Sequence, residues 1–322
     1  MIKKWIAASL LLLGVLTAAN ALAQAYPSRP VKIVVPFAAG GGVDSLARIV
    51  SQYLAPPLKQ TVIVDNRPGA NANLGAELVA KSAPDGYTLL MTSSVSAANR
   101  AMQKNLPYDA LTDFVEIVRV ARAPMILVCS AALPIHSVSD LIAYARANAG
   151  KVSYGSPGVG SGQHLNGEVF TKYVGAQAVH VPYKGGSLAM PDVITGRVTF
   201  MITVPSEVLP LISGGKLRAL AVTGNTRAKA LPDVSTLTEA KVANSGFTVW
   251  WGLVAPAKTP ADIVRRLADD TLAILKLPDV NVAFEKIGVE AAAMPPDEFT
   301  KFYRGEVDRY IDVVREFKIE VE

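Results

Sequence analysis

The pattern of hydrophobic and polar positions alternates between two periods along the chain. Short apolar runs rich in β-branched residues, such as 31–35 and 198–204, are typical of buried strands. Between such runs, apolar residues recur every three or four positions, as they do over 43–54, which indicates an amphipathic helix packed on a core. The repeated change from strand to helix predicts an α/β fold made of βαβ units.

The predicted elements form two series. In the first, we expect strands at 31–35, 61–64 and 87–92 and helices at 43–54 and 74–82. In the second, we expect strands at 125–129, 152–154, 178–181, 198–204 and 217–222 and helices at 137–147, 163–174, 187–195 and 207–213. The C-terminal part adds a strand at 250–255 and a long helix at 296–317. Two α/β lobes are therefore predicted, each with a central, mostly parallel sheet flanked by helices.

Residues 1–25 differ from the rest of the chain. Two lysines precede an apolar stretch over 5–19, and small residues follow it. This order is typical of a secretory signal peptide that is cleaved after Ala23 or Ala25. An uncleaved membrane anchor is the alternative, but the apolar stretch is short for a bilayer span. We therefore expect an exported protein that is soluble from residue 26 onward.

Composition and charge narrow the range of partners. Half of the 322 residues are hydrophobic and 18% are charged, which predicts a folded chain with ample core. The net charge of +5 falls to +3 without the signal peptide, because 30 basic residues then face 27 acidic ones. No run of five or more Lys and Arg residues occurs. We therefore expect no nucleic acid and no polybasic contact with a membrane.

Cysteine and histidine give no sign of a metal site. The single cysteine, Cys129, ends an apolar run, and we interpret it as a buried strand residue. His136, His164 and His180 are scattered and match no zinc motif. We therefore expect no disulfide, no metal and no cofactor.

Two glycine-rich turns, one in each half of the chain, carry the candidate chemistry. They span 37–44 and 155–164, and each leads from a predicted strand into a predicted helix. Free backbone N–H groups and the positive end of the helix dipole make such a turn suitable for an anion. The alternative is that the glycines only permit tight turns. Two matching turns in two lobes predict one anion held from both sides.

Sequence motifs of enzymes do not fit. Ser45 interrupts the glycine spacing of a dinucleotide-binding turn, and Leu217 follows a Gly-Gly-Lys stretch that lacks the rest of a phosphate loop. Neither Ser156 nor Ser161 has a glycine two residues before it, as a nucleophile elbow requires. We therefore expect a binding protein and not an enzyme, with no catalytic residues.

A series of short motifs resembles the Bug family, the extracytoplasmic solute receptors of tripartite tricarboxylate transporters. The motifs run in order from Tyr26 to the C-terminal helices. They include Val34-Val-Pro-Phe, Gly40-Gly-Gly-Val-Asp, Asn66-Arg-Pro-Gly-Ala, His180-Val-Pro-Tyr-Lys-Gly and Trp251-Gly-Leu-Val-Ala-Pro. Each motif alone is weak, but together they cover the whole chain after the signal peptide.

The resemblance implies a two-lobed periplasmic binding protein of type II, the Venus-flytrap fold. Residues 26–128 and 250–322 would form the first lobe, and 129–249 the second. The protein would be a periplasmic monomer that captures a small carboxylate, such as a dicarboxylate, a tricarboxylate or an aromatic carboxylate. It would deliver this ligand to the membrane subunits of the transporter. A periplasmic sensor input domain and a secreted α/β hydrolase are the alternatives.

The resemblance also assigns the ligand to residues of both lobes. In the first lobe these are Phe37, Ala38, Ala39, Gly40, Gly41, Thr92 and Ser93. In the second lobe they are Ser156, Gly158, Ser161, Gly162, Tyr183 and Thr203. The backbone N–H groups and hydroxyls of these residues would bind the carboxylate, and only the closed form would make both sets of contacts.

Three positions leave open questions about the ligand. The segment 201–206 has no acid or amide where the family commonly has one, which argues against an amino acid ligand. Arg100 replaces a common proline and would bind a second carboxylate or lie in solvent. Trp250 and Trp251 would stack on an aromatic ligand or belong to the core.

Overall fold

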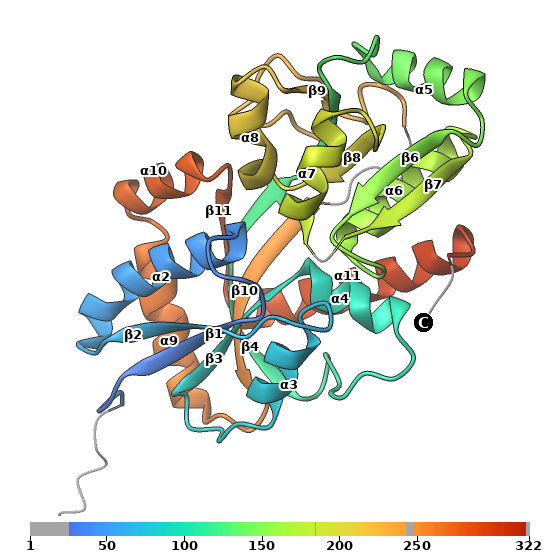
Figure 1. Cartoon of the computed structure of the whole chain (residues 1–322). Helices are drawn as coiled ribbons and strands as arrows, with labels where there is room; N and C mark the ends of the chain where they lie inside the picture. The colour runs from blue at the N-terminus through green and yellow to red at the C-terminus, as the bar shows by residue number, and fades with distance from the viewer. Residues whose placement is uncertain (1–25, 184, 243–247, 320–322) are drawn as a thin grey trace, which may run out of the picture.

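The computed structural model describes residues 26–183, 185–242 and 248–319. The predicted signal peptide lies outside the described residues, so its interpretation stays a prediction. Within the described ranges, no helix combines the length and the hydrophobicity that a membrane crossing requires. Two sheets, each flanked by helices, lie one above the other and define the two lobes (Figure 1).

The first lobe contains the six-stranded sheet, in the order β11-β4-β10-β3-β1-β2. Its strands are β1 (Val31–Val35), β2 (Val62–Asn66), β3 (Thr88–Ser93), β4 (Phe114–Pro124), β10 (Thr248–Pro256) and β11 (Glu290–Met294). Its helices are α2 (Gly42–Leu58), α3 (Asn73–Ala80), α4 (Ser94–Met102), α9 (Ala261–Ile274), α10 (Pro278–Lys286) and α11 (Pro296–Glu316). The lobe therefore combines elements from both ends of the chain.

The second lobe contains the five-stranded sheet, in the order β7-β6-β8-β5-β9. Its strands are β5 (Ile126–Ser130), β6 (Val152–Ser156), β7 (Ala178–Pro182), β8 (Phe200–Thr203) and β9 (Leu217–Val222). Its helices are α5 (Val138–Ala147), α6 (Gly162–Tyr173), α7 (Gly186–Ile194) and α8 (Pro205–Ser213). The exact residues that divide the lobes remain a prediction.

The predicted α/β fold with helix-flanked sheets is confirmed, and the structure adds that both sheets are mixed. β1 pairs in parallel with β2 and β3, but β10 is antiparallel to β3 and to β4. Likewise β6 is parallel to β7 and β8, while β5 is antiparallel to β8 and β9. The reason is the path between the lobes: β4 carries the chain out of the first lobe and β10 carries it back, so these neighbours run in opposite directions.

The point at which the chain leaves the first lobe is hydrogen-bonded to the end of β9 in the second lobe. Met125 lies between β4 and β5, and Thr223 directly follows β9. The Met125 N–H donates to the Thr223 hydroxyl at 2.8 Å, and the Thr223 N–H donates to the Met125 carbonyl at 2.8 Å. Both side chains are fully buried. The chain re-enters the first lobe next to its exit, because Thr248 at the start of β10 lies opposite Pro124 at the end of β4.

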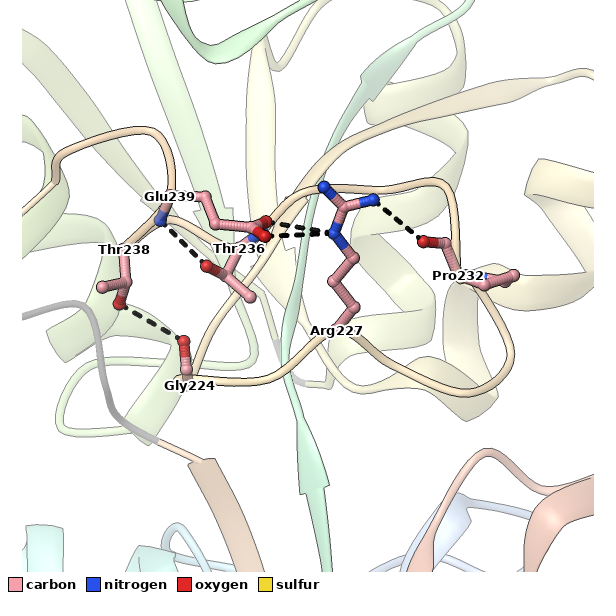
Figure 2. Close-up of polar contacts among 6 residues, drawn as sticks. All are labelled: Gly224, Arg227, Pro232, Thr236, Thr238 and Glu239. Carbon is pink, nitrogen blue, oxygen red and sulfur yellow. Dashed lines mark hydrogen bonds and ion pairs between the residues drawn. The ribbon is translucent and has the colours of Figure 1, made fainter.

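The connection that follows Thr223 is braced by a small polar network (Figure 2). Thr236 and Glu239 bond reciprocally, since each backbone N–H donates to the other's side chain, at 2.7 and 2.9 Å. Arg227 donates to the Glu239 carboxylate and to the Pro232 carbonyl. Outside this network, the exposed Lys229 pairs with Glu285 of α10 at 3.0 Å, which links the second lobe to the first.

The two tryptophans and the cysteine are buried core residues. Trp250 is fully buried, packs edge-on against Phe299 and donates from its indole N–H to Glu306. Trp251 is also buried in the first lobe, so both residues belong to the core. Cys129 is buried in β5, as predicted.

Candidate ligand-binding site at the junction of the lobes

Both glycine-rich turns lie at corresponding places in their sheets. In the first lobe, β1 lies between β2 and β3, so the chain goes from β1 to the neighbour on one side and then to the neighbour on the other side. In the second lobe, β6 has the same relation to β7 and β8. The turns after β1 and β6 therefore lie at a topological switch point, outside the carboxyl ends of parallel strands, where α/β sheets bind ligands.

The first turn, residues 37–41, is exposed from Ala38 to Gly41 and leads directly into α2. Gly41 is the N-cap residue and its backbone is extended, with no side-chain cap. Gly40 has a φ of 81°, a conformation that glycine adopts without strain. The backbone N–H groups at the start of α2 therefore need a partner from outside the helix, such as solvent or an anion.

Asp44 holds this turn from behind. Its carboxylate accepts hydrogen bonds from the Gly40 N–H at 2.9 Å, from Arg48 at 2.9 Å and from Asn66 at 3.0 Å. Asn66 also donates to the Phe37 carbonyl at 3.1 Å. Burial alone would raise the pKa of Asp44, but these hydrogen bonds hold it below its ordinary value. An ionised Asp44 therefore fixes the shape of the turn.

The second turn, residues 156–161, is built on two buried serines. The Ser156 hydroxyl accepts a hydrogen bond from the Gly158 N–H at 3.1 Å. The Ser161 hydroxyl caps α6 by accepting from the His164 N–H, and it donates to the Gly158 carbonyl at 2.8 Å. Gly158 has a φ of 146°, which a residue with a side chain rarely adopts. Both predicted serines thus hold the turn itself together.

Two stacked imidazoles support the second turn. His180 Nε2 lies 2.6 Å from the Ser156 hydroxyl, and His164 Nδ1 accepts from the Gly160 N–H at 3.2 Å. The two rings stack with their centroids 4.0 Å apart. Burial, together with the nearby His164, lowers the pKa of His180 to about 4, against the opposing charge of Glu168. His180 is therefore neutral at pH 7. No local pattern in the sequence indicates that these scattered histidines meet.

Other predicted residues lie at the ends of the neighbouring strands β3 and β7 or at the start of α6. Thr92 and Ser93 are buried at the end of β3, where Thr92 bonds with Ser96 and Ser93 caps α4. The Tyr183 hydroxyl donates to Asp192 at 2.7 Å, and burial followed by this bond raises its pKa to about 12. Gly162 begins α6 directly after the second turn.

Contacts between the lobes bring the two turns to one junction. A Cβ atom placed on Gly42, just after the first turn, would lie 2.5 Å from the Ser206 hydroxyl of the second lobe. A Cβ atom placed on Gly160, in the second turn, would lie 3.7 Å from the side chains of Asn71 and Gln103 of the first lobe. Each turn therefore lies against the opposite lobe. The first turn lies near α8, and the second turn lies near α4 and the segment before α3.

An amide cluster on the first lobe faces the second turn, and sequence analysis missed it. The buried Asn99 accepts from the Asn71 side chain at 2.6 Å and donates to the Asn71 carbonyl and to Asn73, both at 2.8 Å. These bonds hold Ala70, Asn71 and Ala72 at φ values of 47°, 50° and 75°, an unusual run without glycine. Next to Asn99, Arg100 lies exposed in the last turn of α4.

Glu207 is the second residue that sequence analysis missed. It lies in the first turn of α8, and its carboxyl accepts a hydrogen bond from Thr203, a predicted site residue. The carboxyl lies directly on Gly186, because a Cβ atom placed on that glycine would meet the carboxyl atoms of Glu207. Burial raises the pKa of Glu207 above its ordinary value, and the bond from Thr203 offsets this only in part. Its position after a buried strand was the available signal.

Comparison with solved structures identifies the class of protein that this two-lobed fold defines. The Rpa4515 protein of R. palustris, solved with adipate, matches with a TM-score of 0.87 and 34% identity, over 92% of this chain and 100% of that one. MatC of Rhodopseudomonas palustris, solved with malate, matches with a TM-score of 0.82 and 28% identity, over 90% and 100%. The predicted periplasmic binding protein fold is confirmed, and the protein is a solute-binding receptor.

Sequence comparison identifies the family. The model of the tripartite tricarboxylate transporter family receptor matches residues 46–319. The protein BugT of Bordetella pertussis is 35% identical over 301 residues, which cover 93% of this chain and 92% of BugT. The chain therefore belongs to the tripartite tricarboxylate transporter receptors, and the resemblance to the Bug proteins is confirmed.

Proposed function

We propose that this receptor binds a small carboxylate at the junction of the lobes and delivers it to a tripartite tricarboxylate-type membrane transporter. The observation that carries the proposal is the pair of turns after β1 and β6, each at the start of a helix and each against the opposite lobe. Two relatives with the same fold, solved with adipate and with malate, support this class of ligand.

The mechanism follows from the arrangement of the turns. The start of α2 offers N–H groups without a side-chain cap, and the buried Ser161 presents the start of α6. A carboxylate between the lobes receives hydrogen bonds from both turns only when the lobes are closed, so binding shifts the receptor toward the closed form. The thirteen residues assigned to the site remain proposals, and the transporter recognises the closed form.

A charge placed in the first turn tests the proposal. Gly41→Asp adds a favourable N-cap residue to α2, where the backbone is already extended, so the fold is retained. Its carboxylate occupies the N–H groups that the ligand needs, and we expect affinity for adipate, malate or citrate to fall at least about 100-fold. Calorimetry measures the affinity of the probe with which the wild type shows the largest thermal shift.

Gly305→Asp is the matched control, because Gly305 is exposed on α11 and has no neighbour within 4 Å of an added Cβ atom. This variant should bind like the wild type. Equal affinity of the Gly41→Asp variant and the wild type would contradict the proposed site. Lack of binding of every small carboxylate to the wild type would contradict the proposed function.

The route of export and the role in transport are separate parts of the proposal. Residues 1–25 direct export and are removed after Ala23 or Ala25, and the intact mass of the protein from the periplasmic fraction identifies the site. A gene deletion distinguishes transport from sensing. Loss of ligand uptake supports the transport role, whereas intact uptake with loss of a ligand-dependent transcriptional response supports a sensor.

A further inference from the structure

Glu207 lies in the first turn of α8, just after the carboxyl end of β8 in the second-lobe sheet. Because β6 is parallel to both β7 and β8, their carboxyl ends meet at one edge of the sheet. Glu207 follows the end of β8, and Thr203, the last residue of that strand, donates a hydrogen bond to its carboxyl. Its neighbour Ser206 contacts Gly42 at the first turn. The carboxyl therefore lies beside the junction that both turns face.

The carboxyl has no positive partner among the described residues. Its hydrogen bond in that part of the chain comes from the neutral Thr203, and burial raises its pKa. The residue as a whole is nevertheless partly exposed, so Glu207 lies at the edge of the core and not deep within it. A carboxyl whose charge is disfavoured by burial and whose hydrogen-bond donor is neutral is stabilised by a second donor more than a solvated carboxyl is.

We propose that Glu207 is a specificity-determining residue that binds a hydrogen-bond donor, a hydroxyl or an ammonium group, on the ligand end against the second lobe. A donor satisfies the carboxyl, whereas a second ligand carboxylate would place two acidic groups together without a cation. The inference rests on the proposed function, since it needs a ligand anchored at the turns. Under this proposal Glu207, one residue after the segment 201–206, would provide the acidic partner for an amino group that this segment lacks.

Packing against α7 is the competing role for Glu207. The carboxyl lies on Gly186, the first residue of α7, and the N-cap residue Gly185 provides no side-chain cap. A carboxyl at a helix N-terminus stabilises that helix. This role predicts a change in stability when the charge is removed, but no change in the choice between ligands. The two roles are therefore distinguished by measuring discrimination as well as stability.

The experiment compares matched probes on the wild type and on Glu207→Gln. Malate and succinate differ by one hydroxyl, while 6-hydroxyhexanoate, 6-aminohexanoate and adipate share one chain length and differ at one end. We expect the wild type to prefer the hydroxyl or amino member of at least one set about tenfold or more. Glu207→Gln should reduce that preference by at least about tenfold, most of all for the amine.

Glu298→Gln is the control, because Glu298 also lies in the first turn of a helix but is exposed on α11. It should leave the preference unchanged. Binding of the probes without any preference, or a preference that Glu207→Gln does not alter, would overturn this inference and leave the proposed function intact. Failure of every probe to bind to the wild type would overturn both. A change in the melting temperature of Glu207→Gln with unchanged discrimination would assign Glu207 to α7.

Discussion

The two turns of the junction occupy the same topological position but are held in opposite ways. The first turn is exposed, and the ionised Asp44 fixes it from behind with help from Arg48 and Asn66. The second turn is less exposed, with buried residues at both ends, and rests on serine hydroxyls and on the stacked rings of His164 and His180. One turn depends on a charge and the other on the neutral form of His180.

This difference shows that two turns at the same topological position can be made rigid in different ways. The first turn can use a charged side chain, because Arg48 and the hydrogen bonds from Gly40 and Asn66 compensate the charge of the buried Asp44. The second turn uses neutral partners, which avoid the cost of an uncompensated charge in the interior. The two turns should therefore respond differently to acid and to substitutions that remove a single polar group.

The largest effect is expected for Ser156→Val. The substitution leaves the Gly158 N–H without its acceptor and removes the partner of His180 Nε2, both inside the second turn. We expect a loss of about 2 to 4 kcal/mol in the free energy of unfolding and no measurable carboxylate binding. Urea unfolding and calorimetry measure the two quantities.

Ser153→Val is the control on the same strand, because that hydroxyl bonds with the Arg197 carbonyl, away from the turn. Wild-type affinity in Ser156→Val would show that the buried hydroxyl is not needed for the turn.

Acid should weaken the second turn before the first. His180 has a pKa near 4 in the folded protein and an ordinary value near 6.5 when unfolded, so the unfolded chain binds more protons between these values. The stability that this group contributes is complete above pH 6.5 and is lost as the pH falls toward 4, by roughly 2 to 3 kcal/mol. The wild type should therefore be more stable than His180→Gln at neutral pH, and this difference in unfolding free energy should become smaller as the pH falls from 6.5 toward 4.

The contribution of Asp44 does not change within the same pH range. Its pKa lies below the ordinary value of a carboxyl, so its contribution stays complete above about pH 4 and is lost only in stronger acid. His136→Gln, at an exposed position, is the control and should keep the acid sensitivity of the wild type. A constant difference between wild type and His180→Gln from pH 7 to pH 4.5 would contradict the neutral support of the second turn.

A smaller effect is expected for Asp44→Asn. The amide keeps the shape of the side chain but loses the charge that Arg48 and the Gly40 N–H recognise. We expect a loss of about 1 to 2 kcal/mol in unfolding free energy and about three- to tenfold weaker binding, measured by urea unfolding and calorimetry.

Asp140→Asn is the matched control, because Asp140 accepts from the backbone N–H four residues earlier, as Asp44 does, but belongs to α5. Its binding should not change. Equal effects of both substitutions on affinity would show that Asp44 has no special role in the first turn.

Sequence patterns located most elements and both turns, but not the contacts that depend on the tertiary structure. The strands 31–35 and 217–222 were predicted with the bounds that β1 and β9 have. β4 was missed because Glu116, Arg119 and Arg122 interrupt its apolar residues, and each of these polar side chains finds its place only against distant elements.

The same limit applies to the site. Glycine clusters identify turns because conformational freedom is a local property, so 37–44 and 155–164 could be found from the sequence. His164 and His180 meet only because β6, β7 and α6 pack together, and no local pattern records that contact. Glu207 looks like any acid in the first turn of a helix until the fold places it beside the junction.

The pairing of β4 with β10 has a consequence for how a bound solute can be reported. Pro124, which ends β4, lies opposite Thr248, which begins β10, so the strands by which the chain leaves and re-enters the first lobe are held side by side. Two paired segments bend together more easily than they twist apart, and we therefore expect the lobes to move mainly by opening and closing about this pair. A partner that touches both lobes would then recognise the closed angle without contacting the solute.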